Sequence, residues 1–579
     1  MTVDTLFTRA RIFNPYIKAW RVADIAVLNG RILYIGNAAS VGIETANLVD
    51  CGETTVIPGM IDIHLHIESS LCTPHTFSTA VLPHGVTTVV AEHHEMANIF
   101  GQKGIEEMIS ASRKTALDIF HGIPSSVPST NTELETTGGM IDFRNLSSLI
   151  GRNNPDVICL GEVMNYSTLI HEFDQLARDP YTVKSSGMTA YLKEYHPLMA
   201  IEGHCPSVKD LDLAKLLYLG IDSDHCEQDI EGMIQRFTNG MFVEVQEKSL
   251  TREVVEYLQE HDVDSLWAFV TDDVPPDLLV KKGHLDHVVR KALGFGLSIE
   301  KAIIASSYSP ARRMGLRDRG VLAPGKIADL IILNGDPSDF SIEHVYKRGE
   351  PVEQVIAKQE PHHFAPFYHE SIIIHPDSDF TPLFRVISDT DRTVRVMKKS
   401  ALSTYTEESF IHLETRSGTL EWKKIDVKLN LAVVINRYSP ALRFKQGFIS
   451  DDCLSQGAYC TTYAHDHHNI LVLGDNEQDM RIALDWVLSH NGGICVVSNG
   501  NVACAVELPI GGILSTIPMD ALGAQITHIQ EKLHELGIRH PNPVMSLSTC
   551  TLPVSPALKL TDKGLIDVAK TSLVPLFVQ

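Results

Sequence analysis

The sequence lacks the features that mark several broad classes of protein. It has no run of 18 or more apolar residues, and its start has no charged segment followed by an apolar one, so neither a membrane span nor a signal peptide is predicted. Its ten cysteines are scattered singly without a CxxC pair, which argues against a disulfide framework and a thiolate zinc site. We therefore expect reduced thiols and a cytoplasmic location.

Positive charge is also scarce. The 49 Lys and Arg residues are outnumbered by 72 Asp and Glu residues, which gives a formal net charge of -23. A surface of that sign repels phosphate backbones and anionic lipids, so we expect no nucleic acid and no membrane partner. The remaining composition is that of a globular protein, and 579 residues should divide into two or three domains.

Glycine-rich phosphate loops are missing as well. Neither GxGxxG nor GxxxxGK[ST] follows the first strand of the central region, which disfavours a doubly wound sheet. Apolar β-type runs instead alternate with helical patterns. They cover residues 60–67, 86–94, 117–124, 157–163, 198–204, 220–226, 241–246 and 266–273. Eight such strands predict an α/β fold, a (β/α)8 TIM-type barrel.

Two β-rich segments flank the predicted barrel. They contain "ADIAVLNGRILYIGN" in residues 1–56 and "GVLAPGKIADLIILNGDP" in residues 319–360. We expect them to form one small composite, β-sandwich-like domain around a barrel at 57–318. The Pro-containing stretch "EPHHFAPFYHE" then leads into an α/β C-terminal domain at 361–579.

Polar side chains stand at the C-terminal ends of the predicted strands. They are His64, His66, His94, Glu95, Glu162, His204, His225 and Asp272. The active site of a barrel forms at that rim, and residues two apart in a strand point to the same side. A single polar residue there is more often structural, but the joint pattern predicts a metal centre for zinc, iron or manganese. Glu68 lies past its strand end, and we expect it to stay outside the first shell.

The same region and further motifs resemble the bacterial adenine deaminases of the amidohydrolase superfamily. The matching stretches include "PGMIDIHLHIESS", "LGEVMNY", "IEGHCP", "SDHCE", "FVTDD" and the later "HDHHNILVLGDNEQDM" and "LPIGGILS". They run from about residue 57 to 570, nearly the whole chain. HxH after PGxxD is typical of the superfamily, whereas "HIESS", "LGEVMN" and the C-terminal blocks are specific to the deaminases.

The resemblance implies a binuclear centre of two divalent metal ions per subunit, manganese or iron, with zinc as a further possibility. The implied ligands of one ion are His64, His66 and Asp272, those of the other are His204 and His225, and Glu162 would bridge the two. Glu162 would then replace the carboxylated lysine of other relatives.

The implied reaction is the hydrolytic deamination of adenine to hypoxanthine and ammonia in purine salvage. Asp272 would accept the proton of the attacking water and deliver it to the leaving amine, and Glu95 is the candidate acid for the ring. His94 and Asp273 are candidates for contact with the substrate. The partners expected are a small-molecule aminopurine and a second copy in a homodimer.

Several positions depart from the family pattern and leave the substrate open. They are Glu92, His93, Val274, Pro275, Asn436, Tyr438 and His467. Other readings are a deaminase acting on another aminopurine, an N-alkyladenine or a pterin, a cyclic-amide hydrolase, or a catalytically silent paralogue with a binding role. The "HDHHN" stretch at 465–469 predicts either an additional metal site or a polar loop.

Overall fold

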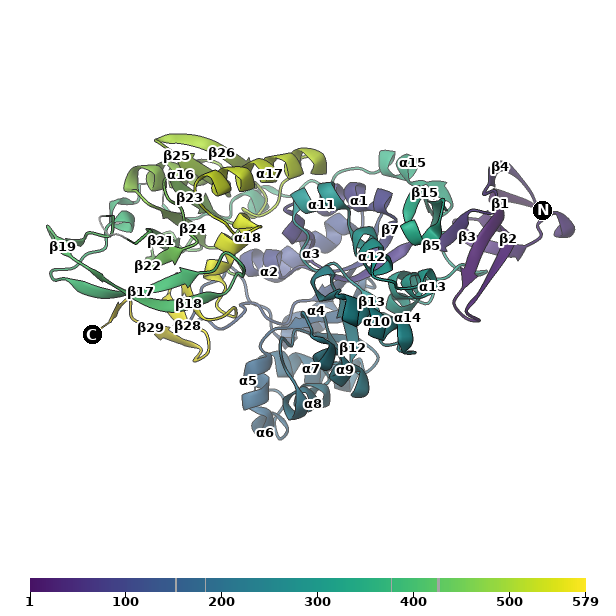
Figure 1. Cartoon of the computed structure of the whole chain (residues 1–579), viewed down its shortest axis with the longest axis horizontal. Helices are drawn as coiled ribbons and strands as arrows, with labels where there is room; N and C mark the ends of the chain where they lie inside the picture. Colours follow the sequence, from purple (N-terminus) through teal and green to yellow (C-terminus); the bar gives the residue numbers. More distant parts are fainter. Residues whose placement is uncertain (151–153, 183, 376, 424–426, 579) are drawn as a thin grey trace.

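The computed structural model describes residues 1–578 apart from 151–153, 183, 376 and 424–426. Three parts lie in a row along the long axis (Figure 1). A β-sheet that includes the N-terminus lies at one end, alternating strands and helices form the middle, and a C-terminal sheet with helices lies at the other end.

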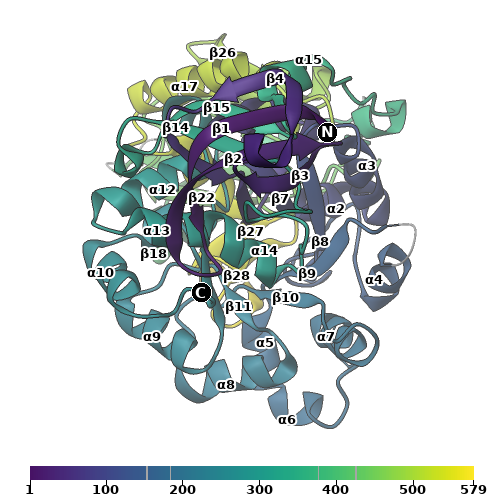
Figure 2. The same ribbon diagram turned by 90° about the vertical axis from the view of Figure 1, so that its right-hand side faces the viewer.

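The end sheet combines strands from both flanks of the central part, and it faces the viewer in Figure 2. Its strands are β1 (Thr2–Asn14), β2 (Ala19–Leu28), β3 (Arg31–Gly36), β4 (Glu44–Asp50), β5 (Thr55–Pro58), β14 (Leu330–Asn334), β15 (Ser341–Lys347) and β16 (Glu350–Pro351). β5 and β14 pair antiparallel with Ile57 opposite Ile331, so segments about 270 residues apart share one sheet. α15 (Val352–Ala357) follows β16.

The central part contains a strand in each of the eight predicted runs. They are β6 (Met60–Leu65), β7 (Val86–Glu92), β8 (Asp118–Ile123), β9 (Val157–Val163), β10 (Ala200–Gly203), β11 (Ser223–Asp224), β12 (Phe242–Val245) and β13 (Trp267–Phe269). β6 to β10 form a five-stranded parallel sheet and β11 to β13 a three-stranded parallel one. Backbone hydrogen bonds cross at both junctions, from Asp222 to Ile201 (3.3 Å) and from Asp272 to His64 (3.0 Å).

Helices connect these strands. They are α1 (Pro74–Val81), α2 (His94–Phe100), α3 (Gln102–Ser112), α4 (Phe143–Leu149), α5 (Tyr166–His171), α6 (Phe173–Leu176), α7 (Lys184–Tyr195), α8 (Asp210–Leu219), α9 (Ile230–Thr238), α10 (Arg252–Glu260), α11 (Pro276–Lys282), α12 (Leu285–Gly294), α13 (Ile299–Ile303) and α14 (Ser309–Arg313). In α10, the Thr251 hydroxyl caps the first turn at the Val254 amide (3.2 Å), and Val255 and Leu258 bury the inner face. No helix in the described part of the chain is long and apolar enough to cross a bilayer.

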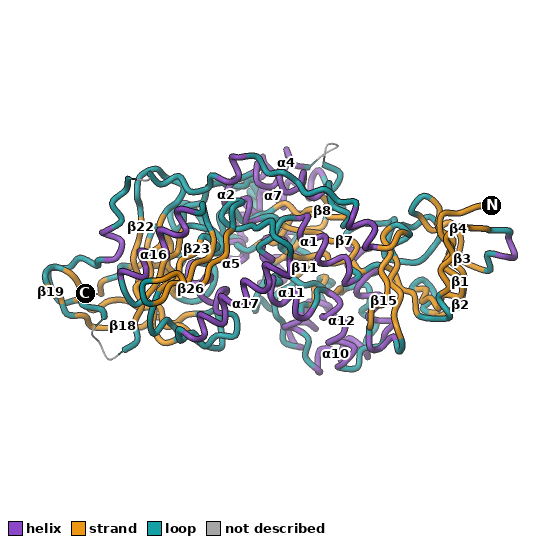
Figure 3. The backbone as a smooth tube through the Cα atoms, turned by 90° about the horizontal axis from the view of Figure 1, so that it is seen from above, coloured by secondary structure: helices purple, strands orange, loops and turns teal. Residues whose placement is uncertain are grey.

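The C-terminal part is a nine-stranded mixed sheet with helices, separated from the N-terminal sheet by the middle part in the view of Figure 3. Its strands are β17 (Arg392–Lys399), β18 (Thr406–Leu413), β21 (Leu429–Ile435), β22 (Phe444–Asp451), β23 (Ala458–Thr461), β24 (Ile470–Gly474), β25 (Gly493–Ser498), β26 (Asn501–Glu507) and β30 (Phe577–Val578). The helices are α16 (Glu477–Ser489), α17 (Met519–Glu535) and α18 (Pro543–Ser548). Smaller sheets are formed by β19 (Thr415–Arg416) with β20 (Thr419–Leu420) and by β27 (Leu558–Thr561), β28 (Gly564–Asp567) and β29 (Ser572–Val574).

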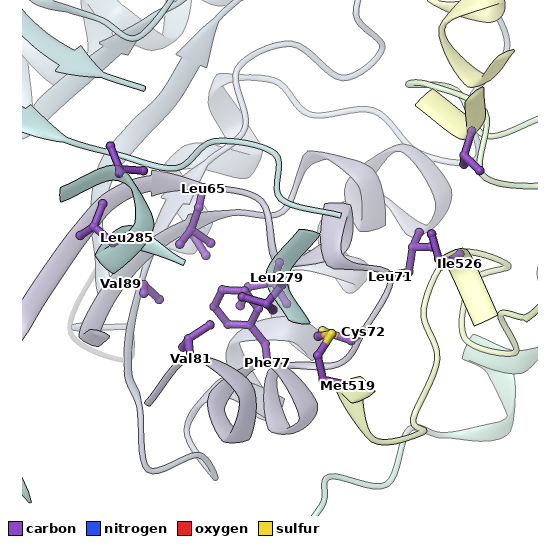
Figure 4. Packing of buried hydrophobic residues seen from close by; sticks show 14 of the residues in the cluster. Leu65, Leu71, Cys72, Phe77, Val81, Val89, Leu279, Leu285, Met519 and Ile526 are labelled. Atoms are coloured by element: carbon purple, nitrogen blue, oxygen red, sulfur yellow. The ribbon is translucent and has the colours of Figure 1, made fainter. Parts of the chain in front are cut away.

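The C-terminal part shares an apolar core with the middle part. Leu71 and Cys72, just after β6, belong to the same buried cluster as Met519 and Ile526 of α17 (Figure 4). The Ser515 amide also donates to the Leu71 carbonyl (2.8 Å). Burial of apolar surface drives this docking, which places the C-terminal part next to the segment carrying the HxH motif.

A cluster of ion pairs joins the middle part to the composite sheet. Asp118 of β8 accepts hydrogen bonds from Arg319 (2.8 Å), Lys347 (2.8 Å) and Arg348 (2.9 Å). Lys347 is buried and also reaches Asp329 (2.6 Å). Burial alone would raise the pKa of Asp118, but Lys347, Arg319 and Arg348 hold it well below its usual value.

We expect Asp118→Asn to lower the free energy of unfolding by about 3 kcal/mol, because it leaves the buried Lys347 ammonium without this charge partner. The depressed pKa means that the Asp118 contribution is complete above the unfolded-state pKa of about 4 and is lost as the pH falls below it. Denaturant titrations at several pH values would check both. Asp262→Asn, at the exposed ion pair with Lys18 (3.2 Å), is the matched control and should change stability little.

Candidate metal centre and active site

Six polar side chains predicted at strand ends meet in the middle part. They are His64, His66, Glu162, His204, His225 and Asp272. Four of them are buried, whereas the side chains of His204 and Asp272 are 33% and 14% exposed. Solvent therefore reaches the cluster on the side of these two residues.

Asp272 lies against the two histidines of the HxH motif. Its Oδ1 atom is 3.7 Å from His64 Nε2 and 3.6 Å from His66 Nε2. The Asp272 amide donates to the His64 carbonyl (3.0 Å), and Gln246 donates to Asp272 Oδ2 (2.8 Å). The carboxylate is thus fixed with one oxygen facing both imidazoles, and these three side chains could hold one metal ion.

Glu162 of β9 contacts histidines on both sides of the cluster. Its Oε2 atom lies 2.8 Å from His204 Nδ1 and 3.3 Å from His225 Nε2. Its Oε1 atom lies 3.5 Å from His66 Nε2. One carboxylate therefore faces both halves of the predicted ligand set, as a bridging ligand must.

The two carboxylates are held in their ionised form. Burial alone would raise the pKa of Glu162, but hydrogen bonds with His204 and His225 hold it well below its usual value. Burial would likewise raise the pKa of Asp272, which His64 and the Lys248 charge keep well below its usual value. The cluster thus offers anionic oxygen next to imidazole nitrogen.

The donor atoms fit divalent metal ions. The buried His64 Nε2 and His225 Nδ1 atoms have no hydrogen-bond partner within the described residues. His66 donates from Nδ1 to the Glu92 carbonyl (3.2 Å), which leaves its Nε2 atom as a ligand facing the carboxylates. Imidazole and carboxylate together suit zinc, iron or manganese.

Glu92, a departure from the family pattern, supports the bridging carboxylate. Its Oε2 atom accepts the Glu162 amide (2.6 Å). This approach requires glycine at position 161, because a Cβ atom there would lie 2.1 Å from Glu92 Oε2. The Glu92 side chain thereby fixes the end of β9.

His94 links the cluster to Glu95. Its Nδ1 atom is 3.8 Å from Glu162 Oε1 and its Nε2 atom is 3.6 Å from Glu95 Oε1. Glu95 is almost fully buried and is contacted by His465 (2.9 Å) and His468 of the "HDHHN" loop. The predicted acid therefore lies beside the cluster, between the central and C-terminal parts.

The remaining departures occupy positions around the site. His93 lies 3.2 Å from the Glu68 carboxylate through Nδ1 and 3.0 Å from His121 Nδ1 through Nε2, with all three side chains buried. Glu68 is thus a buried contact of His93. Asp273, a candidate for substrate contact, accepts a hydrogen bond from the Ser69 hydroxyl.

The departures near the C-terminal part make hydrogen bonds of their own. The Val274 carbonyl accepts from Ser70 (2.7 Å), and Pro275 is the N-cap of α11. Asn436 donates to Asp562 (2.9 Å) and the Tyr438 hydroxyl to the His467 carbonyl (2.7 Å). None of these contacts involves the six clustered side chains.

The sequence interpretation missed Gln246, and it singled out the 465–469 stretch as a metal site or polar loop without predicting its contact with Glu95. Gln246 ends the seventh predicted strand and could have been found by the rule that found the ligands. His465 and His468 contact Glu95 from about 370 residues away, and nothing local in the sequence gives that pairing.

We expect Gly161→Ala to weaken divalent metal binding about 10- to 100-fold, because the new Cβ atom displaces the Glu92 carboxylate from the Glu162 amide. Chelator competition would measure the dissociation constant. Gly294→Ala at the end of α12, where a Cβ atom meets nothing within 4 Å, is the control. Equal affinity in the two variants would contradict this role for Glu92.

Comparisons with known proteins cover the whole chain. Residues 55–352 match the amidohydrolase family and residues 403–572 the adenine deaminase C-terminal domain. The chain is 43% identical to adenine deaminase 2 of Shouchella clausii, over 100% of this chain and 99% of that one, and 41% identical to an adenine deaminase of Clostridium perfringens, with the same coverage. A β-aspartyl dipeptidase structure from Fervidobacterium islandicum covers 62% of this chain and 100% of its own, with 16% identity and a TM-score of 0.46.

Proposed function

Because the chain belongs to the adenine deaminase family of amidohydrolases, we propose that its histidine–carboxylate cluster catalyses the hydrolytic deamination of adenine to hypoxanthine and ammonia, in purine salvage. The observation that carries this assignment of the site is the position of Glu162, whose two oxygens face His66 on one side and His204 with His225 on the other.

We propose that the cluster holds two divalent ions, manganese or iron, with zinc as the alternative. His64, His66 and Asp272 would hold one ion, His204 and His225 would hold the other, and Glu162 would be shared. Such ions supply positive charge that lowers the pKa of water to about 7, so that hydroxide is available at neutral pH.

Asp272 is the proposed base of the reaction. It is kept ionised, its Oδ1 atom faces the HxH histidines, and Gln246 fixes its other oxygen. It accepts the proton of the water that attacks C6 of adenine and passes it to the leaving amine, which departs as ammonia.

Glu95 delivers the proton that the purine ring needs when C6 is attacked. Burial would raise the pKa of Glu95, but His468, His465 and His94 hold it well below its usual value. Burial would lower the pKa of His465, but Glu95 and Asp466 raise it to about 10. The proton is therefore stored on His465 and reaches the ring nitrogen through Glu95. As ammonia leaves and the carbonyl of hypoxanthine forms, the hydroxyl proton at C6 returns to Glu95 and restores this store.

The organisation of the chain follows the same proposal. The two parallel sheets close into one (β/α)8 barrel at 57–318, the flanks at 1–56 and 319–360 form the composite β-sandwich-like domain, and 361–579 is the adenine-deaminase-type domain. Support comes from the hydrogen bonds at both sheet junctions.

None of the ten cysteines forms a disulfide in the described residues, in keeping with a cytoplasmic enzyme. We also propose that the enzyme is a homodimer.

The purified, manganese-loaded protein should release ammonia from adenine and form hypoxanthine. An ammonia assay on adenine, other aminopurines, an N-alkyladenine, a pterin and cyclic amides would test the substrate. If the protein released ammonia from another compound with a higher kcat/KM than from adenine, that compound would replace adenine as the proposed substrate. No release from any of them would leave the silent paralogue as the explanation.

Glu162→Gln should lower the bound metal below two equivalents per chain and lower kcat by at least about 100-fold, because the neutral amide cannot replace a shared anionic ligand. Elemental analysis and the ammonia assay measure the two effects. Glu135→Gln is the control, since this buried carboxyl is bound by Ser129 (3.0 Å) and Thr130 (2.6 Å) and contacts none of the six ligands. Two equivalents of metal in Glu162→Gln would refute the bridging role.

A further inference from the structure

We propose that Asp466, on the C-terminal loop 465–469, is a substrate-binding residue that accepts a hydrogen bond from the imidazole N–H of adenine. It thereby distinguishes the free base from purines substituted at N9. This inference rests on the proposed function and names the part of adenine that the C-terminal domain recognises.

The loop belongs to the active site by its contacts. His465 Nδ1 lies 2.9 Å from Glu95 Oε1 and 3.4 Å from Asp466 Oδ1. One nitrogen or carboxylate oxygen from each of three side chains lies within 4.8 Å of the other two; these residues are His94, Glu95 and Asp466. Asp466 is therefore next to the proposed ring acid and to the histidine that contacts Glu162.

Asp466 has an acceptor that needs a donor. The residue is 3% exposed, and its Oδ2 atom has no hydrogen-bond partner among the described residues. A buried carboxylate oxygen without a donor costs free energy. The neighbouring carboxylate of Glu95 adds repulsion rather than a donor. A bound molecule that presents an N–H group would satisfy this oxygen.

Adenine offers few groups that can serve. Its N–H donors are the exocyclic amine and the imidazole N–H, while its other ring nitrogens are acceptors. The amine is the leaving group and must face Asp272, and the ring acceptor beside C6 faces Glu95 in the proposed mechanism. The imidazole N–H is the donor that remains for Asp466. A substituent at N9 removes this donor.

Hydrogen bonds to the rest of the protein and within the loop hold residues 465–469 in place. The Thr551 hydroxyl donates to the His465 carbonyl (2.9 Å), and Asn469 donates to the Thr136 carbonyl (2.8 Å). His467 Nδ1 accepts the Asn469 amide (3.0 Å), so this side chain is engaged within the loop. Asp466 is thus presented in a fixed position, and His467 is one of the side chains that fix it.

The test compares adenine with 9-methyladenine in the wild type and in Asp466→Asn. We expect kcat/KM for adenine to fall about 10- to 100-fold, mainly through KM, because a charged hydrogen bond is weakened. The inhibition constant of 9-methyladenine should change less than about twofold, because that compound lacks the donor. Asp485→Asn, at the exposed ion pair with Arg481 (3.1 Å) on α16 of the C-terminal part, is the control and should leave both values and their ratio unchanged. Asp466→Ala, which makes room for the methyl group, should bind 9-methyladenine more tightly than the wild type.

If Asp466→Asn weakened the inhibition by 9-methyladenine by the same factor as it lowered kcat/KM for adenine, the proposal would be overturned. That result would show that Asp466 only supports its neighbours. Loss of a metal equivalent from Asp466→Asn, by elemental analysis, would also overturn it and make the loop a metal site. If the wild type releases no ammonia from adenine, the proposed function fails, but calorimetric binding of the two compounds still tests Asp466.

Discussion

The site depends on one carboxylate shared among histidines from neighbouring strands. Glu162 lies between His66 on one side and His204 and His225 on the other, and each of these side chains is fixed by a different strand end. Such a cluster is stable only if positive charge compensates the buried anion. The position of the Glu162 carboxylate depends on the parallel strands, on the side chains that contact the clustered residues, and on the docked C-terminal part.

The residues that contact the proposed ligands constrain the sequence around them. Glu92 occupies the space that the missing side chain of Gly161 leaves free and accepts the Glu162 amide. The Glu92 backbone carbonyl accepts a hydrogen bond from His66 Nδ1 (3.2 Å). One residue that departs from the family pattern thus orients two of the six proposed ligands, so this departure has a supporting role and leaves the proposed ligand set intact.

Periodicity and strand ends were sufficient to predict the eight central strands and the six clustered side chains. These signals are local, since a buried strand reads as a short apolar run and its end is marked by the next polar residues. The contacts of His93 with Glu68 and His121, and those of Glu95 with His465 and His468, could not be predicted in this way. These contacts arise from tertiary packing, and the local sequence of each segment does not indicate which other segment it contacts.

Docking of the C-terminal part explains why the acid lies between two parts of the protein. The apolar contact of Met519 and Ile526 with Leu71 and Cys72 fixes the C-terminal part beside the HxH strand. With that contact in place, His465 of the "HDHHN" loop contacts Glu95, so the proposed proton store and the proposed ring acid belong to different parts of the chain. The six proposed metal ligands all lie in the central part, but without the C-terminal loop Glu95 would lose His465 and His468, two of the three histidines that lower its pKa. The proposed hydrolysis of a purine at this site therefore requires both parts in contact.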